Sequence, residues 1–248
     1  MIAYERIEKA RTENATTLDL SECALTQIPD ELFELTQLEE LVLDSNEIIE
    51  IPDAIAKLVN LKKLSIGEND IDSLPSAIGE LKNLKKIYLG YNMISDLPVE
   101  IGQLVNLEKL HIPRNILISL PDSIGQLKKL QKLSLHDNVL ATLPESIGQL
   151  SSLVELSLDN NELERMPHQI GQLSQLEVFN LAGNRIDELP VTIGNLQNLK
   201  ELMLDENLLN ELPKTLLDCQ SLKFISLYGN PLKMSDEFIA NAQFEMEF

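Results

Sequence analysis

The residues best suited to chemistry gather in one stretch of the chain, between positions 88 and 136. Two of the four tyrosines, two of the three histidines and an arginine fall within it, and they are Tyr88, Tyr91, His111, Arg114 and His136. Tyrosine and arginine are enriched where proteins bind one another, because each combines a large contact area with a polar group. The chemistry favoured by these residue types is therefore non-covalent recognition.

A catalytic or metal-binding use of these residues has little support in the sequence. His111 and His136 could approach one another, but no cysteine or carboxylate completes a ligand set at a compatible position. The signatures of phosphate-binding loops, dinucleotide-binding turns, zinc proteases and serine hydrolases are all absent. We expect no metal, no cofactor and no catalytic residue, and hence a protein that is not an enzyme.

The element that positions these residues is a 23-residue unit, repeated nine times over residues 15–221 without insertion or deletion. Residues 61–83 read LKKLSIGENDIDSLPSAIGELKN. Residues 63–67 alternate between polar and apolar side chains, which predicts a short strand, and residues 71–81 have the wider spacing of a helical or 3-10 turn. Pro75 restricts φ on the return path, and Gly79 is expected to allow a tight turn. A period of this length predicts a solenoid.

An asparagine occupies the same position in eight of the nine units and continues into the segment that follows them. Its side-chain amide can donate to one coil and accept from another, and so satisfy the polar backbone groups of a buried turn. We expect a structural role, as a ladder, for Asn46, Asn69, Asn92, Asn115, Asn138, Asn161, Asn184, Asn207 and Asn230.

The pattern L-x-x-L-x-L-x-x-N-x-[LI]-x-x-L-P-x-x-I-G-x-L resembles the leucine-rich repeat in its 23-residue form. It is similar to repeats of the intracellular Ras-suppressor type and to the arms of bacterial Roco proteins, and it covers about nine-tenths of the chain. The resemblance implies an α/β solenoid shaped as a horseshoe. Parallel strands would line its concave face, with short helices or 3-10 turns on the convex side.

The rest of the chain is expected to close the two ends of a single solenoid domain. Residues 1–14 have the spacing of a capping helix, and residues 222–248 would supply a terminal strand and a second capping helix. The N-terminal residues lack the apolar core of a secretion signal. Cys23 and Cys219 lie eight units apart, too far to form a disulfide bond. These features favour a cytoplasmic, intracellular location.

Charge is distributed unevenly along the chain. Residues 1–60 carry 4 basic and 14 acidic side chains, residues 61–152 carry ten of each, and residues 153–248 carry 6 basic and 16 acidic ones. The total of −20 argues against nucleic acid and anionic membranes as partners. The acidic ends would keep the protein soluble and favour a monomer.

Aligning the repeats shows which side chains vary on the concave face. Four successive units place a lysine at the same strand position: Lys63, Lys86, Lys109 and Lys132. The next exposed columns contain the tyrosines, histidines and arginine named above, and beyond them lie the exposed apolar residues Met93 and Ile116. A solvated lysine ladder and space-filling tyrosines are the alternative explanation of these columns.

We therefore expect a non-catalytic module that binds a protein or peptide through its concave face, while the lysines attract an acidic segment of the partner. The expected binding residues are Tyr88, Tyr91, Met93, His111, Arg114, Ile116 and His136. The two histidines predict that binding changes below about pH 6.5. One alternative is the recognition arm of a larger signalling enzyme, such as a Roco-type GTPase. Another is an array that only stabilises a homo-oligomer.

Overall fold

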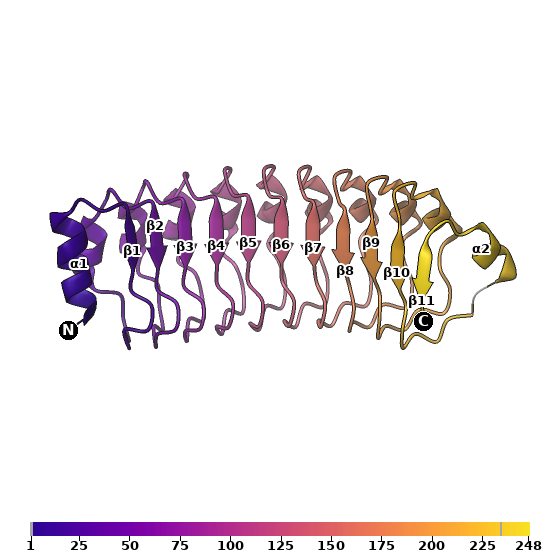
Figure 1. The fold of residues 1–248 in the computed structure, drawn as a ribbon, viewed down its shortest axis with the longest axis horizontal. Coiled ribbons are helices and arrows are strands. Elements are labelled where there is room, and N and C mark those ends of the chain that lie inside the picture. The colour runs from indigo at the N-terminus through magenta and orange to yellow at the C-terminus, as the bar shows by residue number, and fades with distance from the viewer. Residues whose placement is uncertain (1, 234) are drawn as a thin grey trace.

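The computed structural model describes residues 2–233 and 235–248. Over this part of the chain the repeats stack into one elongated solenoid with a single parallel sheet, whose eleven strands follow one another in sequence order (Figure 1). The strands are β1 (Thr17–Asp19), β2 (Glu40–Val42), β3 (Lys63–Ser65), β4 (Lys86–Tyr88), β5 (Lys109–His111), β6 (Lys132–Ser134), β7 (Glu155–Ser157), β8 (Val178–Asn180), β9 (Glu201–Met203), β10 (Phe224–Ser226) and β11 (Glu245–Glu247).

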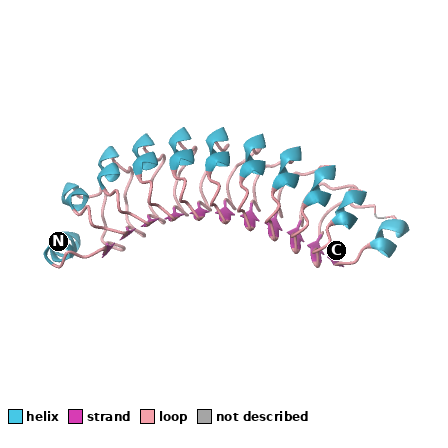
Figure 2. Cartoon of the chain, turned by 90° about the horizontal axis from the view of Figure 1, so that it is seen from above, coloured by secondary structure: helices cyan, strands magenta, loops and turns pink. Residues whose placement is uncertain are grey.

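Each of the first nine strands is followed by a five-residue 3-10 helix on the opposite side of the coil. These helices are η1 (Asp30–Glu34), η2 (Asp53–Lys57), η3 (Ser76–Glu80), η4 (Val99–Gln103), η5 (Asp122–Gln126), η6 (Glu145–Gln149), η7 (His168–Gln172), η8 (Val191–Asn195) and η9 (Lys214–Asp218). Seen from above, the strands line the inside of a curve and the 3-10 helices lie on its outside (Figure 2). The predicted solenoid, with a concave parallel sheet and 3-10 turns on its convex side, is confirmed.

The fixed repeat length sets the register of the sheet. Lys86, Ile87 and Tyr88 of β4 lie opposite Lys109, Leu110 and His111 of β5, and the other repeats pair in the same way. Side chains alternate across a strand, so the central residue points into the core and its two neighbours face the concave surface. Residues 23 positions apart therefore form columns across that surface.

The core consists of the seven apolar positions of every repeat. In the repeat that contains β5, none of these side chains is more than 6% exposed, and they are Leu107, Leu110, Ile112, Leu117, Leu120, Ile124 and Leu127. The sides of one repeat are covered only by the repeats before and after it. Stacking is therefore what completes the burial, as in other solenoids.

Proline and glycine shape the convex side for different reasons. Pro121 precedes η5 with φ of −69°, a value that its ring already imposes. Gly79 was expected to allow a tight turn, but it lies within η3. A Cβ at Gly79 would lie 2.8 Å from the Cβ of Glu100 in the next repeat. The glycine is thus needed because neighbouring 3-10 helices approach closely.

The asparagine amides connect each repeat to the one before it. Asn115 donates from Nδ2 to the carbonyl oxygens of Leu89 and Pro113, both at 3.0 Å, and its Oδ1 accepts from the N–H of Ile94 at 2.9 Å. Both partners outside its own coil, Leu89 and Ile94, lie in the preceding coil. The same bonds to the preceding coil recur at Asn46, Asn69, Asn92, Asn138, Asn161, Asn184, Asn207 and Asn230.

The residue before each ladder asparagine has a left-handed backbone. Its φ lies between 52° and 75° in every repeat from the second onward, although only Gly183 and Gly229 in this column are glycines. The other members are Ser45, Glu68, Tyr91, Arg114, Asp137, Asn160 and Glu206. This backbone conformation is part of the repeat, and it directs a column of side chains away from the turn.

Non-repeat segments flank the repeats at both ends of the solenoid. Helix α1 (Ile2–Thr12) packs against β1 and buries Ile7 together with two alanines. At the other end, Ser235 accepts a hydrogen bond from the N–H of Phe238 at 3.1 Å, where α2 (Asp236–Asn241) begins. The chain then returns to the sheet as β11, which pairs with β10. Nothing in the repeat pattern predicts this strand, because its residues lie outside the 23-residue period.

Candidate functional site

Three rings form a row across the middle of the concave face. Tyr88 ends β4, His111 ends β5, and His136 lies two residues beyond β6. The ring centroids of Tyr88 and His111 are 5.9 Å apart, and those of His111 and His136 are 6.0 Å apart, both in edge-to-face geometry. We call these residues the aromatic row. Each contact of this type favours the observed arrangement by about 0.5–1.5 kcal/mol.

A second row runs parallel to the first along the left-handed column. The guanidinium of Arg114 lies over the Tyr91 ring, 4.8 Å from its centroid, and its Nε is 3.2 Å from the carboxylate of Asp137. The other carboxylate oxygen of Asp137 accepts from Nδ2 of Asn160 at 2.9 Å. We call these four residues the polar row. It connects four successive repeats on the exposed surface.

Asp137 and Asn160 are the members of the polar row that sequence reasoning did not place in the site, and Asp137 makes the ion pair with Arg114. The column of Asp137 places an acid one unit after Arg114, and neighbouring strands bring such residues into contact. The opposite charges 23 positions apart were the signal that could have identified it.

The lysine column is less uniformly basic than its sequence indicates. Lys132 is paired with Glu155 at 2.6 Å, and Lys63 lies 3.8 Å from Glu40, so acids accompany both ends of the column. Within the described chain, no carboxylate lies within 4.0 Å of Lys86 or Lys109. The ammonium of Lys109 lies over the Tyr88 ring, 5.0 Å from its centroid. The uncompensated positive charge is therefore concentrated next to the aromatic row.

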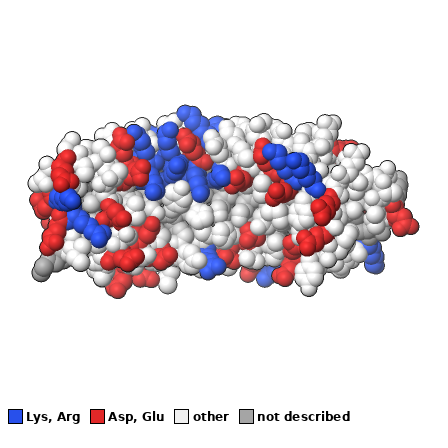
Figure 3. All heavy atoms as spheres, viewed as in Figure 1, with Lys and Arg blue, Asp and Glu red and all other residues white. Residues whose placement is uncertain are grey.

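The space-filling view places this charge in its surroundings. Basic side chains gather along one edge of the concave face over β3–β6, with an uncharged area beside them (Figure 3). Acidic side chains lie towards both ends of the same face (Figure 3). The concave centre therefore differs from its flanks in both charge and residue type.

Two hollows open on either side of His111. The first, of about 240 Å³, is lined by Tyr88 and Tyr91 as well as by acidic and glycine residues of the preceding repeats. The second, of about 220 Å³, lies over β5–β7 and is lined by Lys109 and Lys132 as well as by serines and Glu155. His111 contributes to the walls of both.

Burial determines the protonation state of His111. Partial burial, then the positive charge of Lys109, and then His136 lower the pKa of His111 from 6.5 to about 4. His111 is therefore neutral at physiological pH, and one of its ring nitrogens can accept a hydrogen bond. The predicted change in binding below about pH 6.5 therefore does not come from His111, because its burial, which sequence columns do not show, keeps the ring neutral down to about pH 4.

The apolar residues of the predicted site lie beyond the two rows. Met93 and Ile116 each follow a ladder asparagine and are 55% and 50% exposed. Val139 continues their column and is 37% exposed. They form an apolar border next to the polar row. The structure thus groups the predicted residues into an aromatic row, a polar row, a lysine column and this border.

The acidic residues near the ends of the concave face have local partners. Asp44 accepts from the hydroxyl of Ser65 and from the N–H of Gly67, and Asp205 likewise accepts from the N–H of Tyr228. Among the described residues, no three His, Cys, Asp or Glu side chains are grouped so that they could hold a metal ion. No helix in the described ranges has the length and apolar character that crossing a membrane requires.

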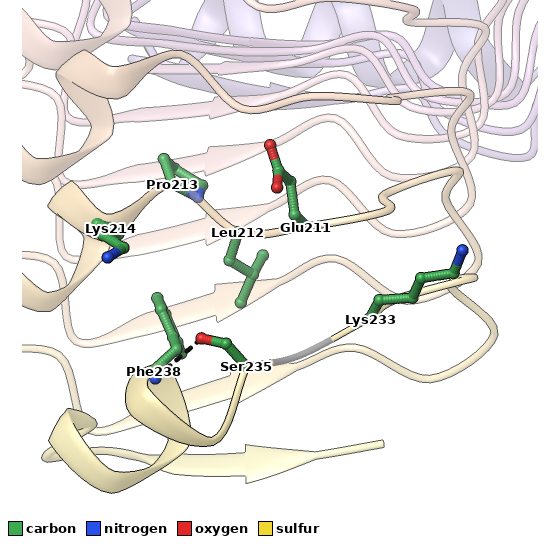
Figure 4. A pocket seen from close by; sticks show the side chains of 7 residues that line it. All are labelled: Glu211, Leu212, Pro213, Lys214, Lys233, Ser235 and Phe238. Carbon is green, nitrogen blue, oxygen red and sulfur yellow. Dashed lines mark hydrogen bonds between the residues drawn. The ribbon is translucent and has the colours of Figure 1, made fainter.

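A larger cavity, of about 430 Å³, lies at the C-terminal end of the solenoid. Leu212 and Pro213 from the last repeat and Phe238 from α2 form its apolar walls, and Glu211, Lys214 and Lys233 line its polar side (Figure 4). Ser235 lies at its border, where its side chain is engaged in starting α2 (Figure 4). The cavity is therefore formed where the terminal helix meets the last repeat, far along the chain from the two rows.

Comparison with known proteins agrees with this architecture. Family models described as leucine-rich repeat region and leucine rich repeat match residues 16–115, 84–162 and 174–232. A leucine-rich repeat protein soc-2 homolog of Nematostella vectensis is 53% identical over 45 residues, a match that covers 18% of this chain and 8% of that protein. The chain thus matches only a small part of this curated relative.

Two solved structures extend the comparison to almost the whole chain. A leucine-rich repeat protein of Leptospira interrogans is 32% identical, with a TM-score of 0.66, over 97% of this chain and 80% of its own. The plant peptide hormone receptor RGFR1, solved in complex with RGF2, is 29% identical with a TM-score of 0.82, over 97% of this chain and 42% of its own. The 23-residue pattern, the stacked parallel strands and these matches together show that the chain belongs to the leucine-rich repeat family.

Proposed function

We propose that this chain is a non-catalytic interaction module, and that it binds a protein or peptide through the concave face over β4–β6. The observation that carries the proposal is the presence of two side-by-side rows of aromatic and polar side chains in the one region where the charges balance. The repeat does not require these residues, because equivalent positions elsewhere are occupied by serine, glycine or aspartate. The aromatic row and Arg114 have the composition of an interface centre.

The type of ligand is inferred from the shape of the site and from one structural neighbour. RGFR1 was solved in complex with RGF2. The concave face is a curved sheet of many strands, each three residues long. An extended segment can lie across several of these strands. We therefore expect an extended peptide segment of a cytoplasmic partner protein, bound by a monomer of this chain. As the recognition arm of a longer signalling enzyme of the Roco type, the chain would use the same face.

The test compares two triple variants as baits in lysate of the source organism. The first changes the site, with Tyr88→Ala, His111→Ala and Arg114→Glu. The second is a matched control with the same residue types changed at exposed positions away from the concave centre, namely Tyr4→Ala, His168→Ala and Arg165→Glu. Circular dichroism and urea unfolding verify that both variants are folded.

The proposal expects a partner that the wild type and the control retain and that the site variant loses, with an affinity at least about tenfold weaker. Purified partner and isothermal titration then give the affinity directly. A partner that the site variant still binds within about threefold of wild type would exclude the concave centre as the binding site. Light scattering of the wild type tests whether it is monomeric.

A further inference from the structure

The two hollows beside His111 are opposite in electrostatic character. This difference restricts the charges that a ligand can carry more than the lysine column alone does. One hollow lies over β2–β4 and the other over β5–β7, with His111 between them. The question is which side chains each hollow can accept. This inference rests on the proposed function, because it specifies the ligand chemistry of the same site.

The hollow over β2–β4 suits a cation. It contains the carboxylates of Asp44 and Glu68, and in the described chain neither has an ammonium or guanidinium group within 4.0 Å. Lys109 and Arg114 already lie over the rings of Tyr88 and Tyr91 at its edge, so the two carboxylates provide the attraction for a further cation. Gly90 contributes no side chain to the lining, which leaves room for the stem of an arginine or lysine.

The hollow over β5–β7 suits a single carboxylate. It contains two ammonium groups, and the Nζ of Lys132 is already 2.6 Å from Glu155. Lys109 has no such carboxylate among the described residues, and thus leaves one positive charge uncompensated. An incoming carboxylate would neutralise Lys109. Charge-assisted bonds of this type are the stronger ones in proteins.

A segment that is acidic throughout fits this face poorly. Its acids would approach Asp44 and Glu68 in the first hollow, and further along they would meet the two ends of the chain, which carry a net −10 each. Like charges at short range oppose binding. The acidic segment expected from the lysine column is therefore narrowed to a single acidic side chain at Lys109.

We infer that the recognised segment carries one basic and one acidic side chain, the basic one seated at Asp44 and Glu68 and the acidic one at Lys109. The hollows are separated by two to three strand spacings of about 4.8 Å each, or roughly 10–14 Å. An extended peptide advances about 3.3 Å per residue. Side chains that face the same surface in an extended segment are an even number of residues apart, so the two side chains are about four residues apart.

The test titrates isotope-labelled full chain with short synthetic peptides and follows the backbone amide signals. Two peptides carry the charges four positions apart in either order, acetyl-Gly-Arg-Ser-Ala-Ser-Glu-Gly-amide and acetyl-Gly-Glu-Ser-Ala-Ser-Arg-Gly-amide, because a segment can cross the strands in either direction. The comparison peptides carry adjacent charges, acetyl-Gly-Ser-Arg-Glu-Ala-Ser-Gly-amide, or two glutamates four positions apart.

We expect the better of the two spaced peptides to bind at least about threefold more tightly than both comparison peptides, and to shift amides in both hollows. Lys109→Glu should weaken this binding and favour a peptide with two arginines. Lys129→Glu makes the same charge change outside both hollows, and it should have neither effect.

Three results would overturn the inference: equal or tighter binding of the two-glutamate peptide, amide shifts confined to one hollow, or no shift with any peptide. These results do not bear on the proposed function, which depends on whether the site variant loses its partner. If the partner is lost and the peptides show no preference, only the charge assignment fails. If the partner is retained, the concave centre itself is excluded.

Discussion

The guanidinium carbon of Arg114 lies 4.8 Å from the centroid of the Tyr91 ring, and both residues have left-handed backbones, with φ of 53° and 58°. A left-handed conformation costs a residue with a Cβ about 1 kcal/mol or more. A cation–π contact at an exposed site returns about 0.5–1 kcal/mol. The contact between the two side chains therefore offsets part of the backbone strain at their left-handed positions. Gly183, in the same column, shows that glycine can occupy this position of the repeat.

Tyr91→Gly is expected to be more stable than Tyr91→Ala by about 1 kcal/mol. Both variants remove the ring and its contact with Arg114, but only alanine keeps a Cβ in the left-handed region. Urea unfolding of the two variants measures the difference. An alanine variant as stable as the glycine variant would show that the backbone is not strained at this position. Both variants should bind the partner more weakly than wild type.

Asn115→Ala is expected to lower the free energy of unfolding by about 3 kcal/mol, because it leaves buried backbone groups of two coils without partners. Asn230 makes equivalent bonds in the last coil but is only half-buried, so water can replace them. Asn230→Ala should therefore cost less than half as much in the same denaturation assay. Equal losses at both positions would contradict the role of burial.

Gly125→Ala is expected to lower the free energy of unfolding by about 2 kcal/mol. A Cβ at this position would lie 2.6 Å from the carbonyl oxygen of Ser146, a backbone atom of the neighbouring repeat. Gly90→Ala is the matched control on the concave side, because its Cβ would first meet ring carbons of Pro113, at 3.1 Å. The control should cost less than about 1 kcal/mol. Thermal unfolding of the two variants measures this difference.

The low pKa of His111 predicts how stability depends on pH. In the unfolded chain this histidine gains a proton as the pH falls through 6.5, whereas in the folded protein it remains neutral until about pH 4. The unfolded state therefore binds more protons between these values, and stability falls as the pH decreases from 6.5 to 4. Above pH 6.5 the residue makes stability neither rise nor fall with pH.

His111→Gln removes this titration. The wild type should thus lose more stability than the variant when urea unfolding at pH 5 is compared with unfolding at pH 7. Nuclear magnetic resonance of the imidazole protons gives an independent value, since the His111 signal should move only below about pH 5. An imidazole that titrates near 6.5 would contradict its burial between Tyr88 and His136.

The fold could be predicted from the sequence because every repeat has the same pattern of residues that favour a strand and a turn. The alternation around Leu64 and the wider spacing after Ile71 identify the strand and the turn, and the constant period sets the register. The reason for Gly79 was not predictable, because it lies in the contact between neighbouring coils. β11 was missed for a related reason: its pairing with β10 depends on the end of the sheet and not on a repeated pattern.

The site could be predicted in part. Columns placed Tyr88 beside His111 and Tyr91 beside Arg114, because residues 23 positions apart are neighbours in this fold. Columns did not show that Lys132 has a carboxylate partner, nor that His111 is buried enough to lose its charge. Both depend on the directions and depths of side chains. The sequence therefore indicates which residues meet, and the structure indicates which charges remain uncompensated.

The thin construction of each coil has a mechanical consequence. A three-residue strand and a five-residue 3-10 helix pack mainly on their counterparts in the next coil, so bending the solenoid distributes a small rotation over many similar junctions. When the solenoid bends, the spacing between the strands on the inner side and the spacing between the 3-10 helices on the outer side change in opposite directions. A slight change in curvature shortens or lengthens the path between the two hollows. The elasticity of the array would thus set how far the spacing between the basic and acidic side chains of the proposed ligand can vary.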